Sequence, residues 1–104
     1  AVRGAPVFND ITRRELAHSG LDGYPCIDTG DPTPGVSLNH ADPEFLARMR
    51  AGDLVLAKGQ GNFETLTDYD RPIFHLFRAK CGIVSKFLGG VPHNSLQLIG
   101  RNLP

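Results

Sequence analysis

The sequence predicts an α/β protein of three layers, in which a mostly parallel β-sheet carries helices on both faces. Strand-like and helix-like segments alternate along the 104 residues, and this alternation is typical of parallel strands joined by helical crossovers. Residues 53–57, DLVLA, are short and almost wholly apolar, as expected for a strand covered on both faces. Residues 41–52, ADPEFLARMRAG, carry the start and stop signals of a helix.

The first part of the chain predicts the end of a strand and then a helix. Residues 1–4, AVRG, are followed by turn residues, so we expect a strand to end there. Residues 9–21, NDITRRELAHSGL, have a helical pattern, with Asp10 or Thr12 as the N-cap. Glu15 lies three positions after Thr12, which is the spacing of a capping box.

The next part predicts a short strand, a loop and the clearest helix. Residues 23–30, GYPCIDTG, are a strand candidate, and the Pro- and Gly-rich residues 31–40 are a loop. In the helix that follows, Asp42 caps the N-terminus, Pro43 occupies the first helical position and Gly52 ends the helix.

The C-terminal half continues the alternation. After the strand at 53–57, residues 60–69 form a short helix or turn. Residues 72–81, PIFHLFRAKC, fit either a helix or a buried strand, and the shortness of the apolar run favours a strand. Residues 82–90 have a helical pattern that ends on two glycines, and residues 95–100 form the final strand.

Composition excludes several classes of function. Eleven basic and 11 acidic residues balance, so no overall field attracts nucleic acid or an anionic membrane. No apolar run is long enough to span a bilayer, and no signal-peptide pattern opens the chain. Cys26 and Cys81 lie far apart without metal-ligand spacing, which favours buried thiols in a reducing compartment and a cytoplasmic location.

The stretch AKGQGN indicates a phosphate-binding turn. Lys58 follows an apolar strand, and ligands collect at the carboxyl ends of the strands in α/β sheets. Gly59 and Gly61 let backbone N–H groups approach an anion closely. Neither a P-loop nor a dinucleotide fingerprint fits, because Lys58 precedes both glycines and Glu64 stands where a third glycine is needed. A glycine-rich turn with a solvated lysine explains the same spacing.

Longer strings of the sequence resemble a known family. One string is a strand followed by Lys58, Gly59, Gly61, Asn62 and Glu64. A second is an apolar strand that ends in Ala79, Lys80 and Cys81. A third is the opening VRGAPVFNDIT, with Gly4, Pro6, Asn9, Asp10 and Thr12. In this order the strings resemble the damage-control phosphatases, metal-dependent enzymes formerly grouped as domain of unknown function 89.

The resemblance implies hydrolysis of phosphomonoesters of small metabolites, such as sugar phosphates or damaged phospho-metabolites. It implies a divalent metal ion (Mg²⁺, Mn²⁺, Co²⁺ or Ni²⁺) held by Asp10 with Asn9, and catalytic roles for Asp10 and Lys58. The residues that it implies for phosphate binding are Lys58, Gly59, Gly61, Asn62 and Glu64. The expected partner is a small phosphorylated metabolite, with no nucleic acid and no membrane.

One family motif is not found in these residues. The family's Asp-Asn-x-Gly-Glu motif, which supplies further metal ligands, lies upstream of the region that matches VRGAPVFND. We therefore expect residues 1–104 to be the C-terminal portion of the phosphatase domain, without the N-terminal helical region. Such a chain needs the missing part or another chain for activity. The alternatives are a non-catalytic phosphate-binding module and a structural half that completes a partner subunit.

Two of these site residues also have a purely structural interpretation. Asp10 can act as a helix N-cap, although a carboxylate with two oxygens can cap and bind a metal at once. Glu64 can be a solvated helix residue. The four histidines show no ligand spacing and are expected to be structural or exposed.

Overall fold

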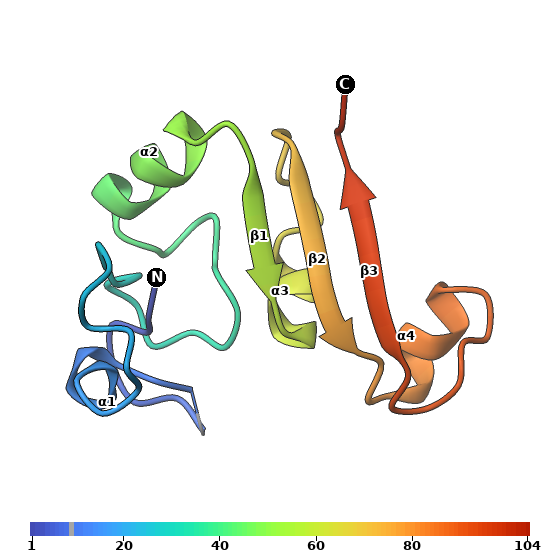
Figure 1. Ribbon diagram of the computed structural model, residues 1–104. Coiled ribbons are helices and arrows are strands. Elements are labelled where there is room, and N and C mark those ends of the chain that lie inside the picture. Colours follow the sequence, from blue (N-terminus) through green and yellow to red (C-terminus); the bar gives the residue numbers. More distant parts are fainter. Residues whose placement is uncertain (9) are drawn as a thin grey trace.

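The computed structural model describes residues 1–8 and 10–104, and its centre is a three-stranded sheet (Figure 1). The strands β1 (Val55–Lys58), β2 (Ile73–Arg78) and β3 (Leu96–Arg101) lie in that order. β1 and β2 are parallel, whereas β2 and β3 are antiparallel. The α/β class is confirmed, and the sheet is mixed rather than mostly parallel. After α4 the chain turns at Gly89 and Gly90, both of which have positive φ. It then enters β3 at the end of the sheet where β2 finishes, so the two strands run in opposite directions.

Four helices accompany the sheet: α1 (Arg13–Leu16), α2 (Pro43–Ala51), α3 (Gln60–Thr65) and α4 (Gly82–Phe87). The signals of α2 are confirmed, because Asp42 accepts a hydrogen bond from the Glu44 N–H, Pro43 opens the helix and Gly52 ends it. The strand prediction for 72–81 and the helix prediction for 82–90 are confirmed as β2 and α4.

The N-terminal region has less regular structure than the sequence predicts. Val2 and Arg3 form only isolated bridges, Val2 with Asp28 and Arg3 with Thr12, so the strands expected at 1–4 and 23–30 do not form. Turn residues cut both segments short, and a proline has no N–H to donate to a ladder.

The helix expected at 9–21 is a single turn, α1. Thr12 rather than Asp10 is its N-cap, and the predicted capping box with Glu15 is present. The chain then turns at Gly20, which has a φ of 78°. Position 9 lies outside the described residues.

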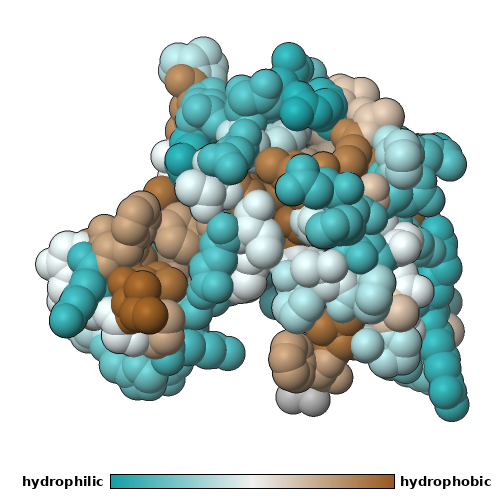
Figure 2. Space-filling view, turned by 180° about the vertical axis from the view of Figure 1, so that it is seen from behind, coloured by the Kyte–Doolittle hydropathy of each residue, from teal (hydrophilic) through white to brown (hydrophobic). Residues whose placement is uncertain are grey.

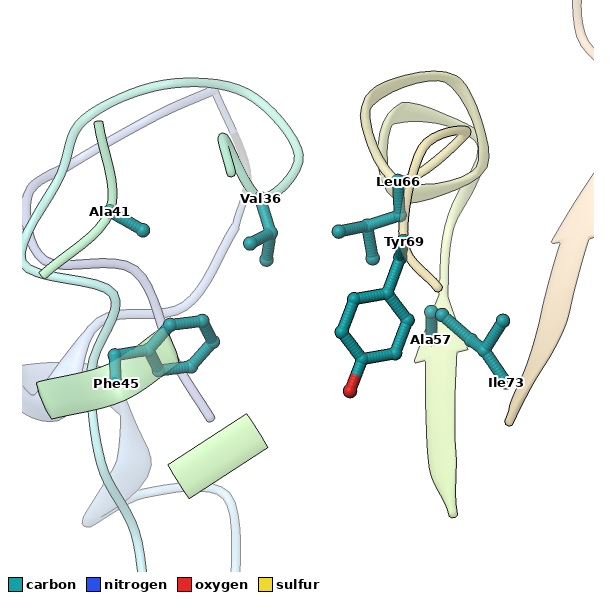
Figure 3. Close-up of a cluster of buried hydrophobic side chains, with 7 residues drawn as sticks. All are labelled: Val36, Ala41, Phe45, Ala57, Leu66, Tyr69 and Ile73. Carbon is teal, nitrogen blue, oxygen red and sulfur yellow. The ribbon is translucent and has the colours of Figure 1, made fainter. Parts of the chain in front are cut away.

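The main core packs the loop of residues 31–40 and α2 against the face of the sheet that carries Ala57 and Ile73. Figure 3 shows Val36, Ala41 and Phe45 on one side, facing the side chains of Leu66, Tyr69, Ala57 and Ile73. The Tyr69 hydroxyl donates to the Met49 carbonyl at 3.0 Å, which satisfies its polar end. A second cluster joins α3 and α4 to β2 through Phe63, Phe77, Ala79 and Val84.

The opposite face of the sheet is apolar and exposed. Leu56, Leu96 and Leu98 are 66%, 62% and 64% exposed. Within the described residues, therefore, no segment covers this face of the first strand. Seen from behind, Figure 2 shows a further brown patch on the lobe that carries α4, where Ile83 and Phe87 are exposed. Among the described residues, no helix is long and apolar enough to cross a membrane.

Candidate functional site

The predicted anion-binding turn directly follows β1. Lys58 is the last residue of β1 and its side chain is exposed. Gly59 has a φ of 106°, which L-residues rarely adopt, and it directly precedes α3. The Gly59 N–H donates to the Leu76 carbonyl at 2.9 Å, so the turn is held against β2.

A second lysine lies at the same edge of the sheet. Because β1 and β2 are parallel, their carboxyl ends meet at one edge, the lower edge in Figure 1. Ala79 is buried after β2, and the exposed Lys80 follows it. The Lys80 N–H donates to the Gln60 Oε1 atom at 2.7 Å. Gln60 therefore ties the two turns together, although it occupies an unspecified position in the motif and gave no sequence signal.

Two predicted phosphate-binding side chains have local partners. The Asn62 amide donates to the Lys58 carbonyl at 2.8 Å and closes the turn. Its Oδ1 atom is buried without a partner among the described residues. Glu64 accepts a hydrogen bond from Gln60 at 2.8 Å, so its carboxylate orients Gln60 in this structure. The binding roles of Asn62 and Glu64 stay predictions.

Gly61 has no positive φ, and a Cβ atom at this position would make only ordinary van der Waals contacts. A Cβ atom at Gly61 would lie 3.4 Å from the Gly35 N atom in the long loop. Gly35 has a φ of 74°, and a Cβ atom there would lie 2.5 Å from the Gly61 carbonyl oxygen. Gly35 thus lets the loop approach α3 closely, and both Gly35 and Gly59 have a positive φ.

Asp10 lies on the loop that precedes α1. The backbone turns sharply before it, because Phe8 has a φ of 47°, a conformation that is strained for an aromatic residue. The Asp10 side chain is 49% exposed, and its Oδ2 atom accepts a hydrogen bond from the Arg3 Nε at 2.9 Å. No described hydrogen bond or ion pair joins Asp10 to Lys58 directly, and Asn9, the other predicted ligand, is outside the described residues.

Asp10 lines a shallow surface pocket of about 220 Å³ that includes a second carboxylate, Glu15. Thr12 donates to the Glu15 Oε2 atom through its hydroxyl and its backbone N–H. These hydrogen bonds, the hydroxyl's first, hold the pKa of Glu15 below its ordinary value. Each carboxylate of this pocket is engaged through one oxygen, Glu15 Oε2 by Thr12 and Asp10 Oδ2 by Arg3.

Asp10 is the type of ligand that a divalent ion prefers, but the described residues around it supply too few such ligands. Asp10 offers the half-exposed carboxylate oxygen that such ions prefer. Within residues 1–8 and 10–104, however, there is no group of three or more His, Cys, Asp or Glu side chains that could hold a metal. Asp10 can therefore contribute to a metal site that needs further ligands from elsewhere.

The family model of the damage-control phosphatase ARMT1-like domain matches residues 1–95. The chain belongs to this family. It is 40% identical over 98 residues to a damage-control phosphatase of Pyrococcus horikoshii, covering 92% of this chain and 34% of that protein. It is 37% identical over 93 residues to an uncharacterised protein of Methanocaldococcus jannaschii, covering 85% of this chain and 31% of that protein.

The structure of this damage-control phosphatase family member also matches a solved one. The crystal structure of a DUF89 family protein from Pyrococcus horikoshii superposes with a TM-score of 0.80 at 39% identity, covering 91% of this chain and 34% of that chain. The chain spans about a third of the length of the relatives that it matches. The family resemblance in the sequence is thus confirmed. The roles of Asn9, Asp10 and the AKGQGN turn stay predictions.

Proposed function

We propose that the whole protein hydrolyses phosphomonoesters of small metabolites, such as sugar phosphates or damaged phospho-metabolites, in the cytoplasm and with a divalent metal ion. The family supports the reaction, because two of the relatives are named damage-control phosphatases. The observation that carries the proposal within this chain is the shared end of the parallel strands β1 and β2, where Lys58 precedes the Gly59 turn and Lys80 follows β2.

This edge suits the charge that phosphoryl transfer must neutralise. Uncatalysed hydrolysis of a phosphomonoester is among the slowest of biological reactions, and positioning with charge stabilisation accounts for most of its catalysis. Lys58 and Lys80 supply positive charge after two adjacent parallel strands, and the hydrogen bond from the Lys80 N–H to the Gln60 side chain joins the segments that carry them. Positive charges next to a bound phosphate act on the substrate and on the transition state.

A metal ion would polarise the phosphoryl oxygens and activate a water molecule. Asp10 is the residue of this chain that would hold it, together with ligands from the rest of the protein or from another chain. The contribution of residues 1–104 is then to bind and orient the phosphate and to present the Asp10 carboxylate.

The test compares Lys58→Ala with Lys86→Ala in the protein as its gene encodes it. Lys86 lies in the last turn of α4, so its substitution controls for the loss of one positive charge. With p-nitrophenyl phosphate and Mn²⁺, we expect Lys58→Ala to lower kcat and to raise KM, because the charge acts on substrate and transition state alike. Kinetics of Lys58→Ala that equal those of Lys86→Ala would contradict the proposal. Phosphate binding without hydrolysis in the wild type would favour the non-catalytic module.

A further inference from the structure

Arg3 connects two segments that the sequence leaves unrelated. Its side chain is only 11% exposed. Its Nε donates to the Asp10 Oδ2 atom at 2.9 Å, and its Nη1 donates to the carbonyl of Gly35 in the long loop. Its backbone N–H also donates to the Ile11 carbonyl at 3.0 Å, so Arg3 holds the Asp10 segment through main chain and side chain.

The loop that Arg3 binds packs closely against the start of α3, next to the predicted phosphate-binding turn at residues 58–62 (the phosphate turn). Gly35 contacts Gly61 so closely that a Cβ atom at Gly35 would lie 2.5 Å from the Gly61 carbonyl oxygen and 2.6 Å from the Thr65 Oγ1 atom. Gly61 is the second residue of α3 and follows Lys58 by three positions. A continuous set of contacts therefore runs from Asp10 through Arg3 and Gly35 to the turn that carries Lys58.

An arginine suits this task better than a lysine. Its guanidinium is planar, stays charged and points its five N–H donors in fixed directions, so it can bind two acceptors in a defined geometry. Asp10 is half exposed, and the hydrogen bonds of the described residues engage only its Oδ2 atom. Its Oδ1 atom is left for a ligand from solvent.

We propose that Arg3 is a positioning residue that fixes the Asp10 carboxylate relative to the phosphate turn through Gly35. The inference rests on the proposed function, in which Asp10 binds the metal ion and Lys58 binds the phosphate. Groups that hydrogen-bond a metal ligand from outside orient it, and their loss lowers metal affinity or activity by about 10- to 100-fold. A misplacement of about 1 Å costs a similar factor in rate.

The experiment uses the protein as its gene encodes it, with three variants. Arg3→Met keeps about the length of the side chain and removes its hydrogen-bond donors. Arg3→Lys keeps the positive charge but lacks the planar guanidinium that can bind two acceptors in fixed directions. Arg13→Met is the matched control, since Arg13 pairs with Asp28 at 2.7 Å and donates to the Cys26 carbonyl rather than to Gly35. The measurements are Mn²⁺ affinity by calorimetry, kcat and KM for p-nitrophenyl phosphate, and hydrogen exchange of residues 33–37 and 59–62.

For Arg3→Met we expect Mn²⁺ affinity and kcat to fall by about 10- to 100-fold, with KM changed less. Exchange should become faster in both segments. Arg3→Lys should be intermediate, and Arg13→Met should equal the wild type in all three measurements. If Arg3→Met does not fold, Arg3→Lys is compared with Arg13→Met in its place.

The two proposals fail in different ways. Wild-type affinity and exchange in Arg3→Met, while Asp10→Asn loses Mn²⁺ binding, would overturn the role of Arg3 and leave the proposed function intact. A wild-type protein that neither binds Mn²⁺ nor hydrolyses phosphomonoesters would overturn the proposed function. In that case, hydrogen exchange of residues 33–37 and 59–62 decides whether Arg3 holds these two segments together. Unchanged exchange in Arg3→Met would refute this role of Arg3 as well.

Discussion

His75 should make the stability of this fold sensitive to acid. The residue lies in the middle of β2 with no exposed surface, and its ring forms a T-shaped pair with the Phe63 ring at a centroid distance of 5.3 Å. Within the described part of the chain neither ring nitrogen has a hydrogen-bond partner. Burial, with a smaller effect of the Arg101 charge, lowers the pKa of His75 below its ordinary value.

The sign of the pH dependence follows from proton binding. Above about pH 6.5, the ordinary histidine pKa, His75 is neutral in both the folded and the unfolded state and adds no pH dependence. As pH falls below that value, the unfolded chain binds a proton and the folded chain does not. The free energy of unfolding then decreases, at a limiting slope of about 1.4 kcal/mol per pH unit, until pH reaches the pKa of the folded state.

The replacement His75→Leu isolates this effect, because leucine has a similar volume and no polar atoms. Leaving a buried polar group without a partner costs about 1–3 kcal/mol. At pH 7.5 the free energy of unfolding of the variant should therefore be at least that of the wild type and up to about 2 kcal/mol higher. The difference between the two proteins should be larger at pH 5.

Urea unfolding of both proteins at pH 7.5, 6 and 5 measures the gap, followed by circular dichroism. The other titrating groups are the same in both proteins, so they cancel in the comparison. A gap that is constant between pH 7.5 and pH 5 would show that His75 is protonated as readily in the folded state as in the unfolded state. The argument from its burial would then be wrong.

Three other predictions follow from the structure. Asp10→Asn should abolish Mn²⁺-dependent hydrolysis while the melting temperature stays within a few degrees, because Asp10 does not cap α1; full activity would remove Asp10 from the site. Gly35→Ala should lower the unfolding free energy by about 2 kcal/mol more than Gly20→Ala in urea titrations, because both have positive φ but only Gly35 has a neighbour in the way. Residues 1–104 alone should bind an apolar dye through the face with Leu56 and Leu98, and replacing both by threonine should reduce the fluorescence; no dye binding by the wild type would show that this face is covered.

The sequence by itself determined the elements whose signals are local. The N-cap, first-turn proline and terminal glycine of α2 all lie within the helix and its two ends, so its bounds are predicted closely. The capping box of α1 and the strand with Lys58 at its end are equally local. The order of short motifs also pointed to the family, because a motif is read along the chain.

Only the tertiary structure decided how these parts meet. The contacts of Arg3, Gln60 and Gly35 could not be predicted, since their partners lie up to 32 residues away in the sequence. Folding brings such partners together through the core, and no local pattern encodes that distance.

The same reason explains the wrong predictions. Whether a strand such as β3 pairs parallel or antiparallel depends on how the preceding connection returns to the sheet. Whether Leu56 is covered depends on what packs against the other side of the sheet. The presence of an apolar side chain in the sequence indicates only that its burial would be favourable. The three-dimensional arrangement of the chain decides whether it is buried.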